Sequence, residues 1–352
     1  MKRPSLFSAG AFSLWLLLPL LAFTTPARGQ VKIEGGARIT AGATGGAGGW
    51  TITGTDPIEI RWGGEVVTAY QTGADNPKPF FYPLIGPTGE NVTRHWPMKE
   101  GVAHEETDHV HHRSMWFGFG KVNGLDFWHE PGSKGKEGSR FGKTVHTGLK
   151  GMQISGANQS LTFHTTTDWV AVDGGQKICQ DKRSFTLQHR DDGGFALDAT
   201  FTIEATEGDV LFEDDKEGAF ALRVMPTLRV KGEVAKGTMT NSAGQAGADV
   251  WGKRANWVDY SGPDSKGAVF GIAMFDHPTN FRNPSWWHAR DYGLFAVNPF
   301  GQGKFEKGAA PDAGNYTIKN GESLTLRYRV LFHAGMGEAE KLNAEFKAFA
   351  GE

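Results

Sequence analysis

Residues 195–204 read FALDATFTIE, and residues 324–332 read LTLRYRVLF. In both stretches apolar side chains occupy every second position, and polar side chains such as Asp198 and Arg327 fill most positions between them. Side chains of a β-strand point alternately to its two faces, so this period predicts two strands with one buried face each. Such strands are typical of sheets that pack together through their apolar faces.

Turn signals and further alternating segments extend the same prediction along the chain. Asp173-Gly174-Gly175 and Asn320-Gly321 are typical of tight turns between antiparallel strands. Further strands are predicted over 161–172, 176–189, 220–230 and 268–275. Only the tail has helical spacing, with apolar residues at 339, 342, 346 and 349. The predicted fold is all-β, a large antiparallel β-sandwich with a short C-terminal helix.

The composition supports a folded β-rich protein and excludes several classes. The 352 residues include 49 glycines and 12% aromatic residues, which suits many turns and a sizeable core. A net charge of -2 argues against a nucleic-acid partner, because nucleic-acid-binding proteins usually carry a basic face. The single cysteine, Cys179, excludes an internal disulfide framework and any cysteine-rich metal site.

The first 29 residues are typical of a cleavable signal peptide. Lys2 and Arg3 provide a positive start, residues 11–23 are largely apolar, and Ala27-Arg28-Gly29 resembles a cleavage site. We therefore expect export to the periplasm or the extracellular space, with no membrane span in the mature chain. A Gly-rich N-terminal segment, residues 30–49, is expected to precede a single β-sandwich domain over 50–352, and within it residues 40–49 are expected to be a loop or linker.

Residues 94–130 form the densest polar cluster of the sequence, with six of the twelve histidines. If residues 109–112 are extended, His109 and His111 share a face and reach one ligand together, while His112 points the opposite way. Three interpretations remain open. The histidines catalyse proton transfer with a neighbouring carboxylate, they bind a metal ion, or they are structural. No cofactor is implied by any motif, and no metal ligand is assigned.

Aromatic and basic residues around the histidines suggest a sugar-binding surface. Trp116 or Trp128 is expected to stack on a sugar ring, because an indole suits the apolar face of a sugar while polar neighbours bind its hydroxyls. Further substrate-binding candidates are Arg94, His95, His112, Arg113, Asn123, Asp126, His288 and Arg290. Arginine is suited to a carboxylate or to a pair of hydroxyls. A carbohydrate is therefore the expected partner.

Several motifs resemble those of known families. The runs DHVHHRS, NGLDFW and YGLFAVNPFG resemble a family of exported bacterial proteins catalogued as uncharacterised or under the label "methane oxygenase". More distantly, His109-Val110-His111-His112 is similar to the first histidine motif of aldose 1-epimerases (galactose mutarotases), and His277-Pro278 to their second. This chain departs from the epimerase pattern at Arg113-Ser114, where that family has Gly-Gly.

The epimerase resemblance implies a supersandwich fold and histidine chemistry at a sugar's anomeric carbon. His111 and His109 would lead the general acid–base catalysis, Asp108 would orient one of them, and His277 would be the partner acid. The expected function is that of an exported carbohydrate-active enzyme, a hydrolase, lyase or epimerase. A non-catalytic glycan-binding protein and a metal-dependent lyase or oxidase are the alternatives.

Overall fold

The computed structural model describes residues 30–31, 40–42, 48–134, 136–155 and 159–351. The predicted signal peptide, residues 1–29, lies outside the described residues. The expected Gly-rich segment contains two short strands, β1 (Gln30–Val31) and β2 (Thr40–Gly42), which pair with strands of the two main sheets. The loop expected over 40–49 therefore begins with a short strand, β2, which pairs with β3 (Trp50–Thr53). Among the described residues no helix has the length and apolar character needed to cross a membrane.

The first large sheet, here sheet 1, has nine antiparallel strands in the order β1-β8-β9-β10-β11-β20-β16-β15-β14. Its strands after β1 are β8 (Gly142–Ser155), β9 (Ser160–Ala171), β10 (Lys177–His189), β11 (Phe195–Glu204), β14 (Thr238–Asn241), β15 (Trp257–Pro263), β16 (Val269–Asp276) and β20 (Ser323–Ala334). β11 and β20 lie side by side, with Phe195 opposite Phe332 and Ile203 opposite Leu324. The two stretches with the clearest period thus form neighbouring strands near the middle of the sheet.

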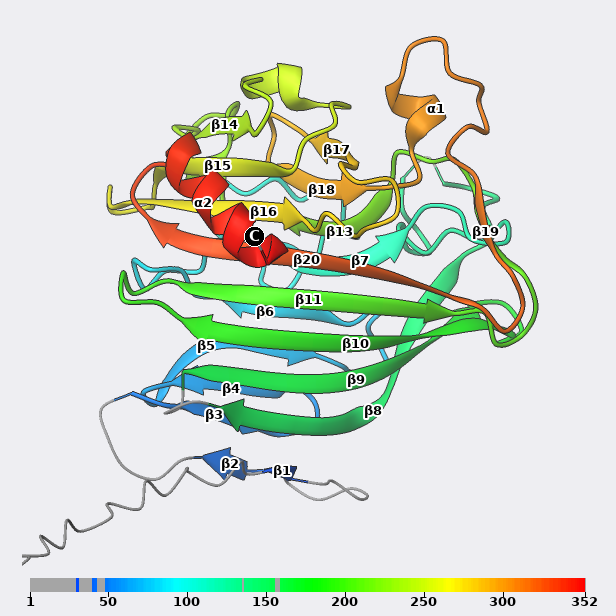
Figure 1. Cartoon of the computed structure of the whole chain (residues 1–352), viewed down its shortest axis with the longest axis horizontal. Helices are drawn as coiled ribbons and strands as arrows, with labels where there is room; N and C mark the ends of the chain where they lie inside the picture. The colour runs from blue at the N-terminus through cyan, green and yellow to red at the C-terminus, as the bar shows by residue number, and fades with distance from the viewer. Residues whose placement is uncertain (1–29, 32–39, 43–47, 135, 156–158, 352) are drawn as a thin grey trace, which may run out of the picture.

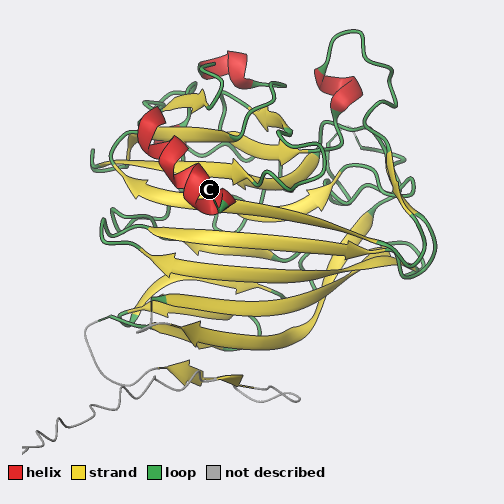
Figure 2. Ribbon diagram, viewed as in Figure 1, coloured by secondary structure: helices red, strands yellow, loops and turns green. Residues whose placement is uncertain are grey.

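The second large sheet, here sheet 2, also has nine strands, in the order β17-β18-β13-β7-β6-β5-β4-β3-β2. They are β3 (Trp50–Thr53), β4 (Ile58–Trp62), β5 (Glu65–Gln71), β6 (Phe80–Leu84), β7 (Met115–Phe119), β13 (Gly218–Arg223), β17 (Trp286–Ala289) and β18 (Leu294–Asn298), besides β2. β12 (Val210–Phe212) and β19 (Tyr316–Ile318) form a separate two-stranded ladder. Figures 1 and 2 show the two large sheets stacked as a sandwich, which confirms the predicted fold class.

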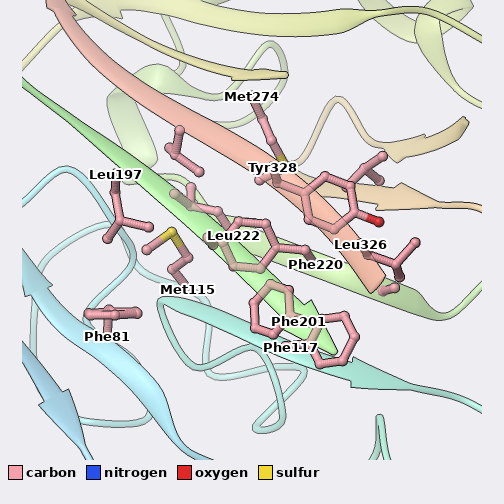
Figure 3. Close-up of a cluster of buried hydrophobic side chains, with 14 of the residues drawn as sticks. Phe81, Met115, Phe117, Leu197, Phe201, Phe220, Leu222, Met274, Leu326 and Tyr328 are labelled. Atoms are coloured by element: carbon pink, nitrogen blue, oxygen red, sulfur yellow. The ribbon is translucent and has the colours of Figure 1, made fainter. Parts of the chain in front are cut away.

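The core lies between the two sheets and is rich in aromatic rings (Figure 3). Phe117 of sheet 2 stacks on Phe201 of sheet 1 with ring centroids 4.0 Å apart, and Phe220 stacks on Tyr328 at 5.6 Å. Each large apolar side chain buried in this way contributes about 1.5–3 kcal/mol to folding. The alternating residues of β11 and β20 therefore supply one half of the core, as the sequence predicted.

In the described part of the chain helices are few and short, and the longest of them is α2 (Ala339–Ala350), which covers part of the outer face of sheet 1 (Figure 1). Its Leu342 packs with Trp257, Phe275 and Leu331. The remaining helices are α1 (Gln302–Phe305) and the 3-10 turns η1 (Pro226–Leu228) and η2 (Gly247–Val250). The predicted strand 220–230 is wrong beyond Arg223, because the chain leaves the sheet and Pro226 opens η1.

Candidate functional site

The floor of the candidate site is the outer face of sheet 2. Trp116, Ala221, Ala296 and His288 stand opposite one another in a row that crosses β7, β13, β18 and β17. Their neighbours along each strand, such as Phe117, point into the core instead. The small side chains of Ala221 and Ala296 leave space above the middle of this row, and residues from the loops before and after β7 lie over it.

A column of stacked rings rises from this floor. The His112 ring lies on Trp116 with centroids 5.3 Å apart, and His109 lies on His112 at 4.7 Å. The amide of His112 donates to the carbonyl of His109 at 2.9 Å, so this segment is a turn. The condition of an extended segment over 109–112, under which His109 and His111 would share a face, is therefore not met. His109 and His112 stack together, and His111 meets both rings at steep angles.

Asp108 and His109 form one carboxylate–imidazole pair above the column. Asp108 Oδ2 lies 2.5 Å from His109 Nδ1, and Asp108 Oδ1 accepts a hydrogen bond from buried Arg94 at 2.7 Å. Arg94 also donates to the carbonyl of His109 at 2.8 Å. Partial burial opposes ionisation of Asp108, but the bond from His109 and the charges around it hold its pKa well below the usual range. His109 is the most open histidine of this column, with 40% of its side chain exposed.

The loop that carries this pair is strained. His104, His109 and Ser114 have φ angles of 62°, 43° and 54°, in the left-handed region that non-glycine residues seldom adopt. Three such residues lie within the eleven residues of this loop, and each raises the conformational free energy of the folded loop. Strain of this kind is concentrated at binding and catalytic sites, where the surrounding contacts maintain it.

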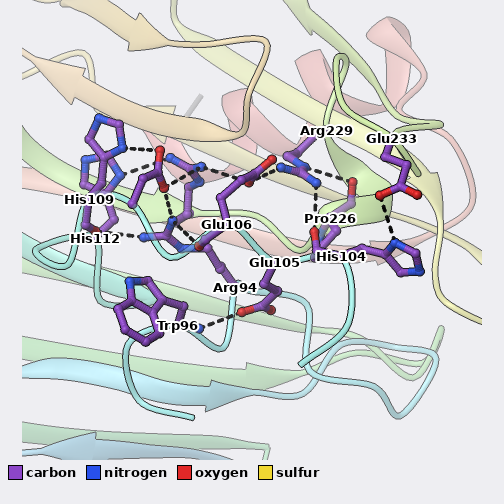
Figure 4. A network of polar contacts seen from close by, with 12 residues as sticks. Arg94, Trp96, His104, Glu105, Glu106, His109, His112, Pro226, Arg229 and Glu233 are labelled. Carbon is purple, nitrogen blue, oxygen red and sulfur yellow. Dashed lines mark hydrogen bonds and ion pairs between the residues drawn. The ribbon is translucent and has the colours of Figure 1, made fainter. Parts of the chain in front are cut away.

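Ion pairs fasten the loop to the body of the protein (Figure 4). Glu106 pairs with Arg229, and Arg229 also donates to the carbonyl of His104 at 3.1 Å. Arg223, from the outer face of β13, lies 3.2 Å from His112 Nδ1 and 3.8 Å from both Glu106 and Asp108. Burial and the nearby charge of Arg94 lower the pKa of Arg223 to about 10. It remains a cation at neutral pH.

Asp126 and His129 form a second carboxylate–imidazole pair. His129 Nδ1 lies 2.9 Å from Asp126 Oδ2, while Asp126 Oδ1 accepts the backbone amides of Trp128 and His129. Because the carboxylate accepts, it selects the tautomer with the proton on Nδ1 and leaves His129 Nε2 as the free nitrogen. Burial opposes ionisation of Asp126, but the bonds from His129 lower its pKa overall.

His111 lies between the two pairs. Its ring centroid is 4.3 Å from His129 and 5.6 Å from His109. Burial, followed by the charge of Lys78, lowers the pKa of His111 far below its ordinary value, so His111 is neutral at physiological pH. Its buried Nδ1 has no hydrogen-bond partner in the described part of the chain, which marks a polar atom that a bound molecule can satisfy.

Lys78 and Glu130 border the second pair. Lys78 is buried, donates to the carbonyl of Trp128 at 2.5 Å and lies 3.8 Å from Glu130. Burial lowers the pKa of Lys78 to about 8, although Glu130 opposes the shift. Arg113 closes this edge with a bidentate bond to Glu130, both contacts being 2.9 Å. The Arg113 guanidinium is thus already engaged by a carboxylate.

The far side of the cluster is built by β17, β18 and the residues before β13. His288 donates towards the carbonyl of Lys216 at 2.9 Å and lies 3.6 Å from Glu217. Burial opposes ionisation of Glu217, but its neighbours His288, Lys216 and His129 lower its pKa overall. Tyr292 stacks on His109 with centroids 5.7 Å apart and so joins this side to the ring column.

Two hollows border the cluster. One, of about 840 Å³, is lined by His95, His104, Glu105 and Glu233 among others, on the far side of the strained loop. The other, of about 340 Å³, is lined by Ala248, Trp251, Ala289, Arg290 and Asp291. His95, a predicted binding residue, thus faces the larger hollow, and its ring bonds to the Tyr82 hydroxyl at 2.8 Å.

The structure does not bring every predicted residue to the cluster. His277 follows β16 on sheet 1, where its ring packs against Phe349 of α2, so it shares no hollow with His109 or His111. Asn123 lies in a turn, where its amide bonds to the backbone of Asp209 and Leu211. We therefore remove both residues from the site.

Trp116 and Trp128 also differ from expectation. Their rings pack together with centroids 5.1 Å apart, and the two side chains are 1% and 0% exposed. They form the base beneath the histidines, and no sugar ring can stack on them in this conformation. The indole nitrogens of both have no partner among the described residues.

Sequence reasoning missed Lys78, Glu217, Arg223 and Tyr292. His129 is one of the six histidines counted in residues 94–130, but the sequence assigned it no role. The first four come from separate strands and turns, and no local motif distinguishes them. His129 had a usable signal, because Asp126 precedes it by three residues in the polar run.

No three His, Cys, Asp or Glu side chains in the described ranges are arranged to hold a metal ion. A family model described as "Family of unknown function (DUF6807)" matches residues 57–347. The chain belongs to this DUF6807 family. The matched range includes both carboxylate–imidazole pairs, so the cluster is part of the DUF6807 region of the chain. No curated protein matches the sequence.

Proposed function

We propose that this protein is an exported carbohydrate-active enzyme that uses histidine acid–base chemistry. The observation that carries the proposal is the arrangement of two carboxylate–imidazole pairs, Asp108–His109 and Asp126–His129, on either side of the neutral His111. A carboxylate fixes the tautomer of its imidazole and stabilises the charged form that proton transfer creates. Two such pairs can supply one acid and one base.

Each histidine has a distinct role in this proposal. His129, with Nδ1 bound to Asp126, presents Nε2 to a substrate proton, and the more exposed His109 acts as its partner from the other side of His111. His111 stays uncharged and donates or accepts a hydrogen bond through its free Nδ1. This assignment replaces His277 by His129 as the partner of His109.

A sugar is the substrate class that these groups suit best. The site combines neutral imidazoles, carboxylates and guanidiniums, which can bind several hydroxyls at once. The two hollows near it, of about 340 and 840 Å³, are large enough for small sugars, although His109, His111 and His129 do not line them. The resemblance to aldose 1-epimerases, with their supersandwich fold, adds to this choice. The burial of Trp116 and Trp128 removes the ring stacking expected for the enzyme and for the glycan-binding alternative alike, so the choice of a sugar depends on the polar groups and on the resemblance.

The test is turnover by the purified protein on a panel of neutral sugars, uronates and oligosaccharides, with products followed by NMR and mass spectrometry. We expect His109→Ala and His129→Ala to lower turnover by about 10²-fold or more. His164→Ala is the matched control, because His164 is exposed on the outer face of sheet 1. Unchanged turnover in both site variants, or saturable binding by wild type without any product, contradicts the proposed catalysis.

Export is tested separately. N-terminal sequencing of protein recovered outside the cytoplasm should begin at Gln30 if the segment 1–29 is a cleaved signal. Recovery of the intact chain from the cytoplasm alone contradicts this part of the proposal.

A further inference from the structure

Arg290 is an unpaired cation beside the cluster. Its guanidinium packs against Tyr292 and Trp251, 5.3 and 5.8 Å from the ring centroids. Among the described residues its side chain forms no ion pair and no hydrogen bond. Aromatic faces hold the guanidinium in place and leave its donors free.

The hollow beside Arg290 offers one further unused polar group. The indole nitrogen of Trp251 is buried and has no partner in the described part of the chain. The His288 ring lies 6.4 Å from Trp251 but outside the lining of the hollow. Buried polar atoms without partners are rare unless a ligand or water satisfies them. Arg290, Trp251 and Asp291 line one space of about 340 Å³.

The charged side chains that line this hollow suit a ligand that carries both a carboxylate and hydroxyls. A guanidinium is suited to bind a carboxylate through two parallel hydrogen bonds. Asp291 lines the same hollow and can accept hydrogen bonds from hydroxyls. An acidic sugar carries a carboxylate and several ring hydroxyls at separate positions, so Arg290 and Asp291 can each bind a different group of one molecule, whereas inorganic phosphate has all its oxygens on one atom.

Tyr292 connects the hollow to the proposed catalytic groups. Arg290 and Arg223 both pack on its ring, and His109 stacks on it as well. A ligand held by Arg290 therefore lies one aromatic ring away from the Asp108–His109 pair. We propose that Arg290 binds the carboxylate of an acidic sugar, a uronate, in the hollow beside Trp251 and Asp291. That the bound sugar is then converted rests on the proposed function, whereas the binding of the uronate by Arg290 does not.

Calorimetry on the full chain tests the inference with matched ligands. The probes are galacturonate and glucuronate oligosaccharides, the methyl esters of the same sugars, and inorganic phosphate. The ester removes the negative charge with little change in shape. We expect the free acids to bind at least about tenfold more tightly than their esters, because a charge-assisted hydrogen bond is lost on esterification.

Arg290→Gln should lower affinity for the acid to that of the ester and leave affinity for the ester unchanged. Arg290→Lys should keep part of the preference, since the charge remains and the bidentate geometry is lost. Arg327→Gln is the control, because Arg327 is exposed on sheet 1. Equal binding of acid and ester, a preference that survives Arg290→Gln, tighter binding of phosphate, or no binding of any probe overturns the inference.

The catalytic proposal and this inference fail in different ways. His129→Ala should retain the preference for the acid, because His129 is not part of the hollow. A protein that binds uronates through Arg290 but converts no sugar contradicts only the catalysis. Turnover of neutral sugars without any uronate preference contradicts only the role of Arg290.

Discussion

Asp126 Oδ2 lies 2.9 Å from His129 Nδ1, and the second oxygen of the same carboxylate is held by two backbone amides. The amide bonds fix the carboxylate on the loop, and the carboxylate in turn fixes the imidazole. Because Asp126 and His129 are only three residues apart in the sequence, this pair forms within one short segment of the chain. Its function depends on the tertiary structure, which places His111 at 4.3 Å from His129.

Replacing Asp126 by Asn should disturb the tautomer of His129. An amide side chain of the same shape is uncharged and has only one acceptor oxygen. The preference of His129 for the proton on Nδ1 is therefore weakened. We expect turnover to fall by about 10²-fold or more, while the far-UV circular dichroism spectrum stays native. The direct measurement is the ¹⁵N chemical shift of the two ring nitrogens of His129. An unchanged Nδ1–H tautomer in Asp126→Asn contradicts the orienting role.

Acid should destabilise the protein through its buried neutral histidines. Burial lowers the pKa of His288 to about 4, whereas an unfolded histidine has a pKa near 6.5. The unfolded state therefore binds the proton first, and stability is lost as pH falls below about 6.5, reaching about 3 kcal/mol for this group near pH 4. Urea unfolding between pH 4.5 and 8 measures the slope.

His288→Asn should show a shallower loss of stability on acidification. Asn keeps a donor near Nδ1 for the carbonyl of Lys216 but takes up no proton. A slope identical to that of the wild type would show that His288 does not titrate on unfolding.

His333 should contribute to the pH dependence of stability with the opposite sign, so that its contribution is lost as pH rises. Burial alone disfavours its charged form, but the hydrogen bond and charge of Asp259, 3.0 Å away, raise its pKa above the ordinary value. Its contribution to stability is complete below about pH 6.5 and is lost as pH rises through the folded-state pKa. His333→Asn should therefore lose more stability at pH 6 than at pH 9 in urea unfolding. Equal losses at both values contradict a charged His333.

Trp116 should contribute to the stability of the fold rather than stack on a ligand. Because its ring is buried under His112 and against Trp128, Trp116→Ala should lower the free energy of unfolding by about 3–5 kcal/mol. Trp116→Phe should lose less, since it keeps most of the buried ring. Urea unfolding measures both variants. A Trp116→Ala protein of wild-type stability that has lost sugar binding restores the stacking role predicted from the sequence.

The fold class was predictable because strand patterning is local. β9, β10, β11 and β20 coincide with predicted segments to within a few residues, since each shows period two between clear turns. β16 also coincides with a predicted segment, but as a continuous apolar run that is buried at every position after Val269. β13 is the informative exception. The apolar run continues past Arg223, but Pro226 has no backbone donor for a sheet ladder, and the chain turns away.

The sequence by itself determined that the chain is built of antiparallel strands and that its polar chemistry is concentrated over residues 94–130. Only the tertiary structure decided which side chains meet. It placed His277 on the opposite sheet and buried Trp116 and Trp128 under the histidines. It also brought Glu217, Arg223 and Tyr292 to them from a bend, a strand and a turn far along the chain. Strand period fixes the face on which a residue lies, whereas the order of strands in a sheet depends on pairings between distant segments that no local pattern encodes.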